Sequence, residues 1–75
     1  MNTIQMNLFD YFYENESFTT KEATEVIKTV KDMHVNDESV RARIYEGVER
    51  GIFSKISRGV YQVTSKLKEK KQDVF

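Results

Sequence analysis

The chain has 75 residues, no cysteine and no proline, and its twelve basic residues balance twelve acidic ones. This length allows one small domain, and without thiols the chain can form neither a disulfide nor a thiolate zinc site. The N-terminus lacks the pattern of a signal peptide and no stretch has the length of a membrane span, so we expect a cytoplasmic protein.

The charges are divided unevenly along the chain. Residues 1–25 carry five acidic side chains and one lysine, whereas residues 41–71 carry nine cations and three acids. A basic half favours a polyanionic partner such as nucleic acid, although the same charges could simply be solvated helix faces.

The first predicted helix covers residues 3–14, with Asn2 or Thr3 as its N-cap. Apolar side chains recur there at helical spacing. The side chains predicted to face the core are Ile4, Leu8, Tyr11 and Phe12.

Two more helices follow. One covers residues 20–31 and starts with the capping-box pattern Thr19-x-x-Glu22, with Phe18 just ahead of it. The other covers residues 37–50, is capped by Asn36, and is ended by Gly51 at the C′ position. Their predicted core faces hold Ala23, Val26, Ile27 and Val30 in the first and Val40, Ile44, Gly47 and Val48 in the second.

A β-hairpin is predicted over residues 52–64. The stretches GIFSKIS and GVYQVT alternate, are rich in β-branched and aromatic residues, and meet at a turn where Gly59 can adopt a positive φ. The lysine-rich residues 65–75 then form a basic C-terminal tail or a short fourth helix.

The stretches FTTKEATEVI and DESVRARIYEGVERGIFSKISRGVYQV resemble the winged helix-turn-helix superfamily. The likeness covers Ile4 to Thr64 and is strongest to small phage and plasmid regulators and to the winged-helix region of abortive-infection antitoxins. It implies a mainly helical α+β domain over residues 1–64, with three helices and a C-terminal two-stranded wing. Gly47 departs from the family pattern, which has a large aliphatic residue there, so helix 37–50 is either thinner at this point or unusually close to the first helix.

The resemblance implies binding of double-stranded DNA, with helix 37–50 in the major groove. The helical wheel independently leaves a face outside the core that begins with small polar residues, with two arginines beside it. The candidates for contact are Ser39, Arg41, Ala42, Arg43, Tyr45 and Glu46. Arginine can read guanine through paired hydrogen bonds. The two arginines could instead pair with acidic residues of the same helix.

The hairpin and the start of helix 20–31 supply further candidates. Lys55, Ser57 and Arg58 lie on or near the wing tip, where arginine can enter a narrow minor groove. A charged hairpin can also serve only to protect a sheet edge. The candidates for a DNA phosphate are Thr19, Thr20 and Lys21, because helix N-termini favour anions.

The first helix is apolar on nearly every side. The wheel puts Met6, Phe9 and Tyr13 opposite the core, and we expect these side chains, or the C-terminal tail, to form a homodimer interface. A different protein could bind there, in which case the domain would be a protein–protein interaction module without specific DNA binding.

No residue pattern indicates an enzyme. The chain has one histidine, His34, in a predicted turn, and lacks the nucleotide-binding and metalloprotease motifs. No metal site, no small-molecule cofactor and no membrane association is expected. The sequence therefore predicts a small transcriptional regulator of phage, plasmid or other microbial origin, cytoplasmic and nucleoid-associated when bound to DNA.

Overall fold

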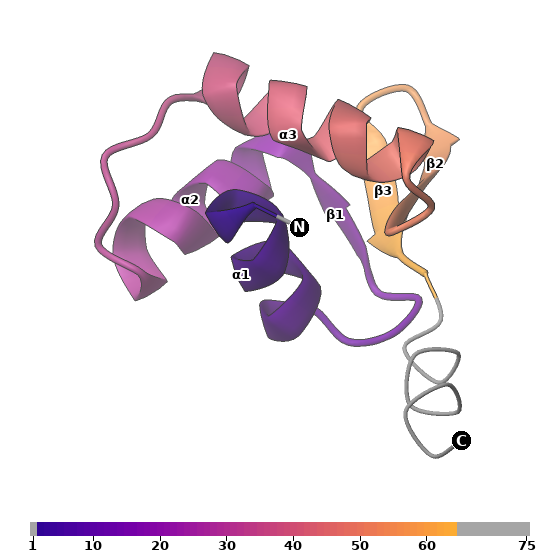
Figure 1. Ribbon diagram of the computed structural model, residues 1–75, viewed down its shortest axis with the longest axis horizontal. Coiled ribbons are helices and arrows are strands. Elements are labelled where there is room, and N and C mark those ends of the chain that lie inside the picture. The colour runs from indigo at the N-terminus through magenta and orange to yellow at the C-terminus, as the bar shows by residue number, and fades with distance from the viewer. Residues whose placement is uncertain (1, 65–75) are drawn as a thin grey trace.

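The computed structural model describes residues 2–64 (Figure 1). Its elements are α1 (Thr3–Tyr11), β1 (Ser17–Thr19), α2 (Thr20–Val30), α3 (Asp37–Glu49), β2 (Phe53–Ser57) and β3 (Val60–Val63). The predicted α+β class, the three helices and the hairpin are confirmed. The predicted basic tail or fourth helix, residues 65–75, lies outside the described residues.

The helix starts follow the predicted caps. The Thr19 hydroxyl accepts a bond from the Glu22 amide at 3.1 Å, and the Glu22 carboxylate accepts one from the Thr19 amide at 2.8 Å. Asn2 caps α1 in a capping box with Gln5, and Asn36 accepts from the Ser39 amide at the start of α3. These side chains satisfy backbone donors that have no partner inside their helices.

The end of α3 also follows the prediction. Gly51 has a φ of 81°, and its amide donates to the Val48 carbonyl at 3.1 Å. The next amide, of Ile52, donates to the Gly47 carbonyl at 2.8 Å. This is a Schellman motif, which turns the chain directly from α3 into β2.

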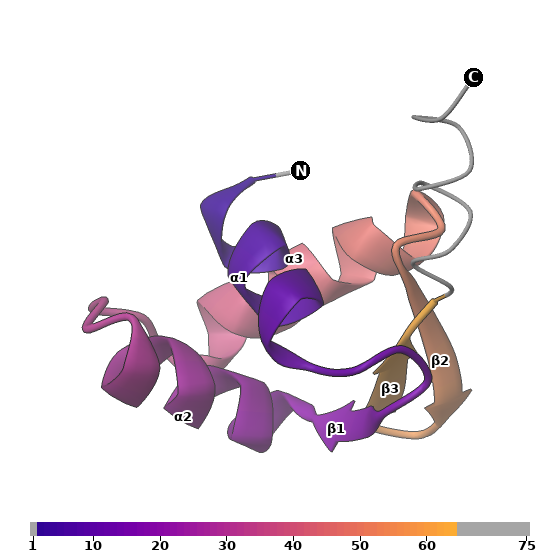
Figure 2. The ribbon, with the colours of Figure 1, turned by 90° about the horizontal axis from the view of Figure 1, so that it is seen from below.

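The sheet has three strands, so the predicted two-stranded wing is incomplete. Its order is β1-β3-β2, and both pairings are antiparallel. In β1, Phe18 lies opposite Tyr61. β1 continues without a break into α2 and lies beside β3 (Figure 2). β1 is only three residues long and carries the N-cap of α2, so its residues have the pattern of a helix start rather than that of a strand.

Phe18 is the centre of an aromatic cluster between the helices and the sheet. Its ring stacks on Phe12 at 4.5 Å and meets the edge of Phe53 at 5.7 Å, measured between centroids. The Tyr61 ring lies 6.3 Å from Phe18. The core is completed by aliphatic side chains of all three helices and of β3, namely Leu8, Ala23, Ile27, Val40, Ile44 and Val63.

The predicted core face of α1 is partly wrong. Phe9 is buried with Leu8 and Phe12, whereas Tyr11 is half exposed. The buried side chains Gln5, Leu8, Phe9 and Phe12 follow an i, i+3, i+4, i+7 pattern that includes one polar residue. The Gln5 side chain donates from Nε2 to the Arg43 carbonyl at 2.9 Å and thereby connects α1 to α3.

In α2, Val30 was predicted to face the core but is half exposed. It is the last residue of the helix, where it lies beyond the packed part of the core.

Gly47 lies against β2 rather than against α1. A Cβ added at Gly47 would lie 2.3 Å from Cδ2 and 2.6 Å from Cε2 of Phe53. The missing side chain therefore makes room for a buried ring, and the expected close approach is to the sheet.

No helix among the described residues combines the length and the apolar character that crossing a membrane would require.

Candidate nucleic-acid interface

Three segments enclose a hollow of about 570 Å³ on one side of the molecule. They are the start of α2, the exposed face of α3, and the β2–β3 hairpin. The lining residues are Thr19, Thr20, Lys21, Asp37, Arg41, Tyr45, Lys55, Arg58, Gly59 and Tyr61. Seven of the twelve residues predicted to contact DNA are therefore brought together from three separate parts of the sequence.

The start of α2 forms one wall of the hollow. Thr19 uses its hydroxyl to cap the helix at the Glu22 amide, so this side chain is already occupied. The amides of Thr20 and Lys21, in the first turn, have no partners within the helix. With the helix dipole, they give this wall a positive potential.

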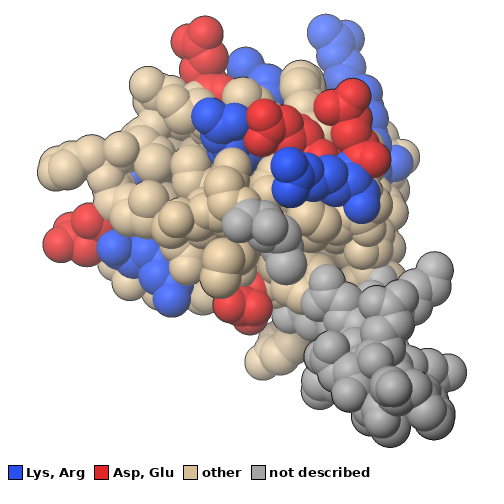
Figure 3. Space-filling model, viewed as in Figure 1, with Lys and Arg blue, Asp and Glu red and all other residues tan. Residues whose placement is uncertain are grey.

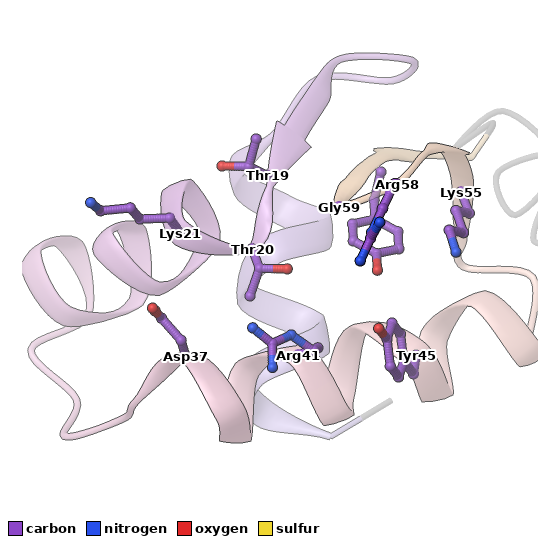
Figure 4. A pocket seen from close by; sticks show the side chains of 10 residues that line it. Thr19, Thr20, Lys21, Asp37, Arg41, Tyr45, Lys55, Arg58 and Gly59 are labelled. Carbon is purple, nitrogen blue, oxygen red and sulfur yellow. The ribbon is translucent and has the colours of Figure 1, made fainter.

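Arginine and lysine side chains from two further elements reach the same space. In Figure 4, Arg41 and Tyr45 come from successive turns of α3; the Arg41 guanidinium lies on the side of Asp37 and Thr20, and Tyr45 lies opposite Lys55 and Arg58 of the hairpin. Within residues 2–64, no side-chain hydrogen bond or ion pair engages Lys21 or any of these three cations. The one acidic lining residue is Asp37, so the hollow has an excess of positive charge.

Tyr45 and Tyr61 connect α3 to the central strand of the sheet. Tyr61 is 2% exposed and Tyr45 is 51% exposed. Their rings meet edge to face at a centroid distance of 6.3 Å. Burial raises the pKa of the Tyr61 phenol, the nearby Tyr45 phenol raises it further, and the charge of Arg41 opposes both. Tyr61 was not among the predicted contact residues. The alternation in VYQV indicates that its side chain faces inward.

Arg43 does not line the hollow. Its guanidinium donates to both carboxylate oxygens of Glu46 at 2.9 Å, which is the intrahelical pairing left open by the sequence. Arg43 instead borders a smaller depression of about 480 Å³ with Asn2, Thr3, Ile4 and Met33. The two arginines of α3 thus have different surroundings.

Four more of the predicted contact residues are not among those that line the hollow. Ser39, Ala42 and Ser57 are exposed but do not line it, and neither does Glu46. They remain candidates for an extended ligand that covers more of the surface than the hollow itself.

One of the three side chains predicted to form a homodimer surface on α1 is buried in the core. Met6 and Tyr13 are exposed at 49% and 80%, but Phe9 is 8% exposed and belongs to the core. The helical wheel failed because the buried face includes Gln5, and because α1 ends at Tyr11 and Phe12 is already extended. In the view of Figure 3, the surface over α1 is largely uncharged, whereas positive and negative groups are mixed along α3.

No group of three or more histidine, cysteine, aspartate or glutamate side chains in residues 2–64 is placed to hold a metal ion. His34 is exposed in the segment between α2 and α3.

Comparison of the chain with protein-family models, with curated proteins and with solved structures found no match.

Proposed function

We propose that the chain is a winged helix-turn-helix protein that binds double-stranded DNA through the face containing the hollow, as a small transcriptional regulator. The element order helix, strand, helix, helix, strand, strand is compatible with that fold. In this arrangement α3 enters the major groove and the β2–β3 hairpin is the wing. The observation that carries the proposal is the convergence of unpaired cations from α2, α3 and the hairpin on one side.

The charge distribution explains how a chain with no net charge can bind a polyanion. Lys21, Arg41, Lys55 and Arg58 line one hollow, whereas Arg43 is neutralised by Glu46 outside it. A duplex responds to the local potential at its phosphates, because salt screens charges beyond about 10 Å at moderate ionic strength.

The test is binding of a fluorescent random-sequence duplex at several salt concentrations. Each phosphate contact contributes a slope of about −0.9 to the plot of log affinity against log salt. Lys55→Gln and Arg58→Gln should each weaken binding and make the slope shallower by about one unit. Lys28→Gln is the matched control, because Lys28 is in the last turn of α2 and does not line the hollow.

Two results would contradict the proposal. The wild-type protein could show no salt-dependent binding to duplex DNA, or Lys28→Gln could reduce the slope as much as the hairpin variants do. The first result would favour the alternative in which the domain is a protein–protein interaction module.

A further inference from the structure

We propose that Asp37 is a specificity-determining residue that accepts a hydrogen bond from the exocyclic amino group of a base in the major groove. Cytosine and adenine carry such a group on that edge, whereas guanine and thymine do not. This inference rests on the proposed DNA binding and concerns which sites the protein selects.

Asp37 is the acidic exception in a hollow that otherwise attracts phosphates. It lines the hollow together with four cations. Asp37 is exposed in the first turn of α3, and its side chain extends toward α2 in Figure 4. In helix-turn-helix proteins the residues at the start of the recognition helix are the ones that contact base edges. The proposed orientation of α3 therefore brings this carboxylate to the floor of the major groove.

The fold does not use the Asp37 carboxylate. The N-cap of α3 is Asn36, whose Oδ1 accepts from the Ser39 amide at 2.8 Å. In the part of the chain that the structure describes, no ion pair or side-chain hydrogen bond engages Asp37. Its charge is favourable at the positive end of the helix dipole, but Glu38 supplies the same charge in the same turn. The oxygens of Asp37 are therefore available to a ligand.

A carboxylate in this place distinguishes among base edges because it accepts hydrogen bonds and cannot donate them. Cytosine N4 and adenine N6 are donors in the major groove. Guanine presents only the acceptors O6 and N7 there, and thymine presents the acceptor O4. Leaving an ionised acceptor unpaired in a desolvated interface is unfavourable. Asp37 should therefore favour cytosine or adenine at one position and exclude guanine and thymine.

The neighbouring cations make this contact compatible with binding to a polyanion. The Arg41 guanidinium lies on the Asp37 side of the hollow (Figure 4), and Lys21 lines the hollow as well. Their positive charges offset the repulsion between the carboxylate and the DNA phosphates. Lys55 and Arg58, on the hairpin, remain available to the phosphates themselves.

The experiment is selection of binding sites from a pool of random duplexes, followed by sequencing, for wild type, Asp37→Asn and Glu38→Gln. Wild type should enrich cytosine or adenine about tenfold over guanine and thymine at one position of the site. The amide in Asp37→Asn can donate as well as accept, so guanine and thymine should be admitted at that position. Glu38→Gln is the matched control, because it removes the same charge from the same turn and Glu38 does not line the hollow. Its selected site should match that of wild type.

Thermal unfolding of the same three proteins distinguishes base reading from a purely structural role. Both substitutions remove one negative charge from the start of α3, so both should lower Tm by a similar small amount. Only Asp37→Asn should also change the selected site. A lower Tm for Asp37→Asn with an unchanged site would show that the carboxylate only stabilises the helix, and would overturn the inference.

The remaining outcomes separate this inference from the proposed function. If wild type selects no position that excludes both guanine and thymine, or if Glu38→Gln relaxes that position as much as Asp37→Asn does, Asp37 does not read a base. If wild type binds duplexes without sequence preference, this inference is wrong while DNA binding stands. If wild type binds no duplex, the proposed function fails and this inference with it.

Discussion

Replacing Gly47 with alanine tests the packing of α3 on the sheet. In an open helix position this change is stabilising by about 1 kcal/mol, because glycine loses more backbone freedom on folding. Here the new methyl group would lie 2.3 and 2.6 Å from two ring carbons of Phe53, well inside van der Waals contact. Either the backbone of α3 or the Phe53 ring must move for the methyl group to fit.

The Phe53 ring has little room to move. It is 1% exposed and packs edge-on against Phe18 at 5.7 Å. Overfilling a packed core costs about 1–3 kcal/mol, and contacts to a confined ring belong in the upper part of that range. After subtracting the gain in helix propensity, we expect Gly47→Ala to lower the free energy of unfolding by about 1–2 kcal/mol.

Thermal unfolding followed by circular dichroism measures this effect. For a domain of this size the loss corresponds to a fall of about 4–16 °C in Tm. In a Phe53→Leu background, where a flexible side chain replaces the ring, the same Gly47→Ala change should cost less. A higher Tm for Gly47→Ala than for wild type, or an equal cost in both backgrounds, would refute the reasoning.

Three further predictions concern the interface, the surface of α1 and alkaline stability. Arg41→Ala should weaken binding to a selected duplex by about 1–3 kcal/mol. Arg43→Ala should weaken it much less, because the Arg43 side chain is paired with Glu46. Equal losses of affinity for the two variants in a titration would contradict this difference. Phe9→Glu should abolish cooperative thermal unfolding because it buries a charge, whereas Tyr13→Glu should stay folded. If α1 forms a homodimer, Tyr13→Glu should also halve the mass found by light scattering. A monomeric wild type would contradict the homodimer. The pKa of Tyr61 is raised in the folded state, so its contribution to stability is complete below the pKa of the unfolded chain, near 10, and is lost as pH rises through the pKa of the folded state. Tm should therefore fall less between pH 9 and 11 in Tyr61→Phe than in wild type. Identical falls would contradict the raised pKa.

The helix boundaries were largely predictable because they depend on local chemistry. The capping residues Asn2, Thr19 and Asn36 each bond to an amide three residues along, and Gly51 adopts the positive φ expected of it. These interactions need no knowledge of the rest of the fold. The segments they delimit were therefore right to within a few residues.

The errors arose where distant parts of the chain decide the structure. β1 exists because β3 pairs with it, and three residues carry no periodicity of their own. Gln5 is buried because the Arg43 carbonyl accepts its side chain, which allows Phe9 to enter the core and leaves Tyr11 half exposed. A helical wheel that assigns only apolar residues to the core cannot find such a face.

The site was predictable in its residue types and less so in its grouping. The helix and hairpin candidates followed from charge and from the winged-helix resemblance, and seven of them line the same hollow. The separation of Arg41 from Arg43 depends on the pairing with Glu46, which the sequence allowed but did not require. The contact between the rings of Tyr45 and Tyr61 joins two elements that are distant from each other along the sequence.

The position of β3 in the middle of the sheet has a consequence for folding and recognition. β3 is bonded to β1 on one side and to β2 on the other, so it joins residues 17–19 to residues 53–57. Contacts between such distant residues form late in folding, and amide protons of a central strand exchange with solvent mainly through opening of the whole domain. The hairpin cannot loosen from α2 and α3 without losing the aromatic core. The walls of the hollow are therefore largely set by the core, so the proposed DNA binding would require little loss of backbone entropy.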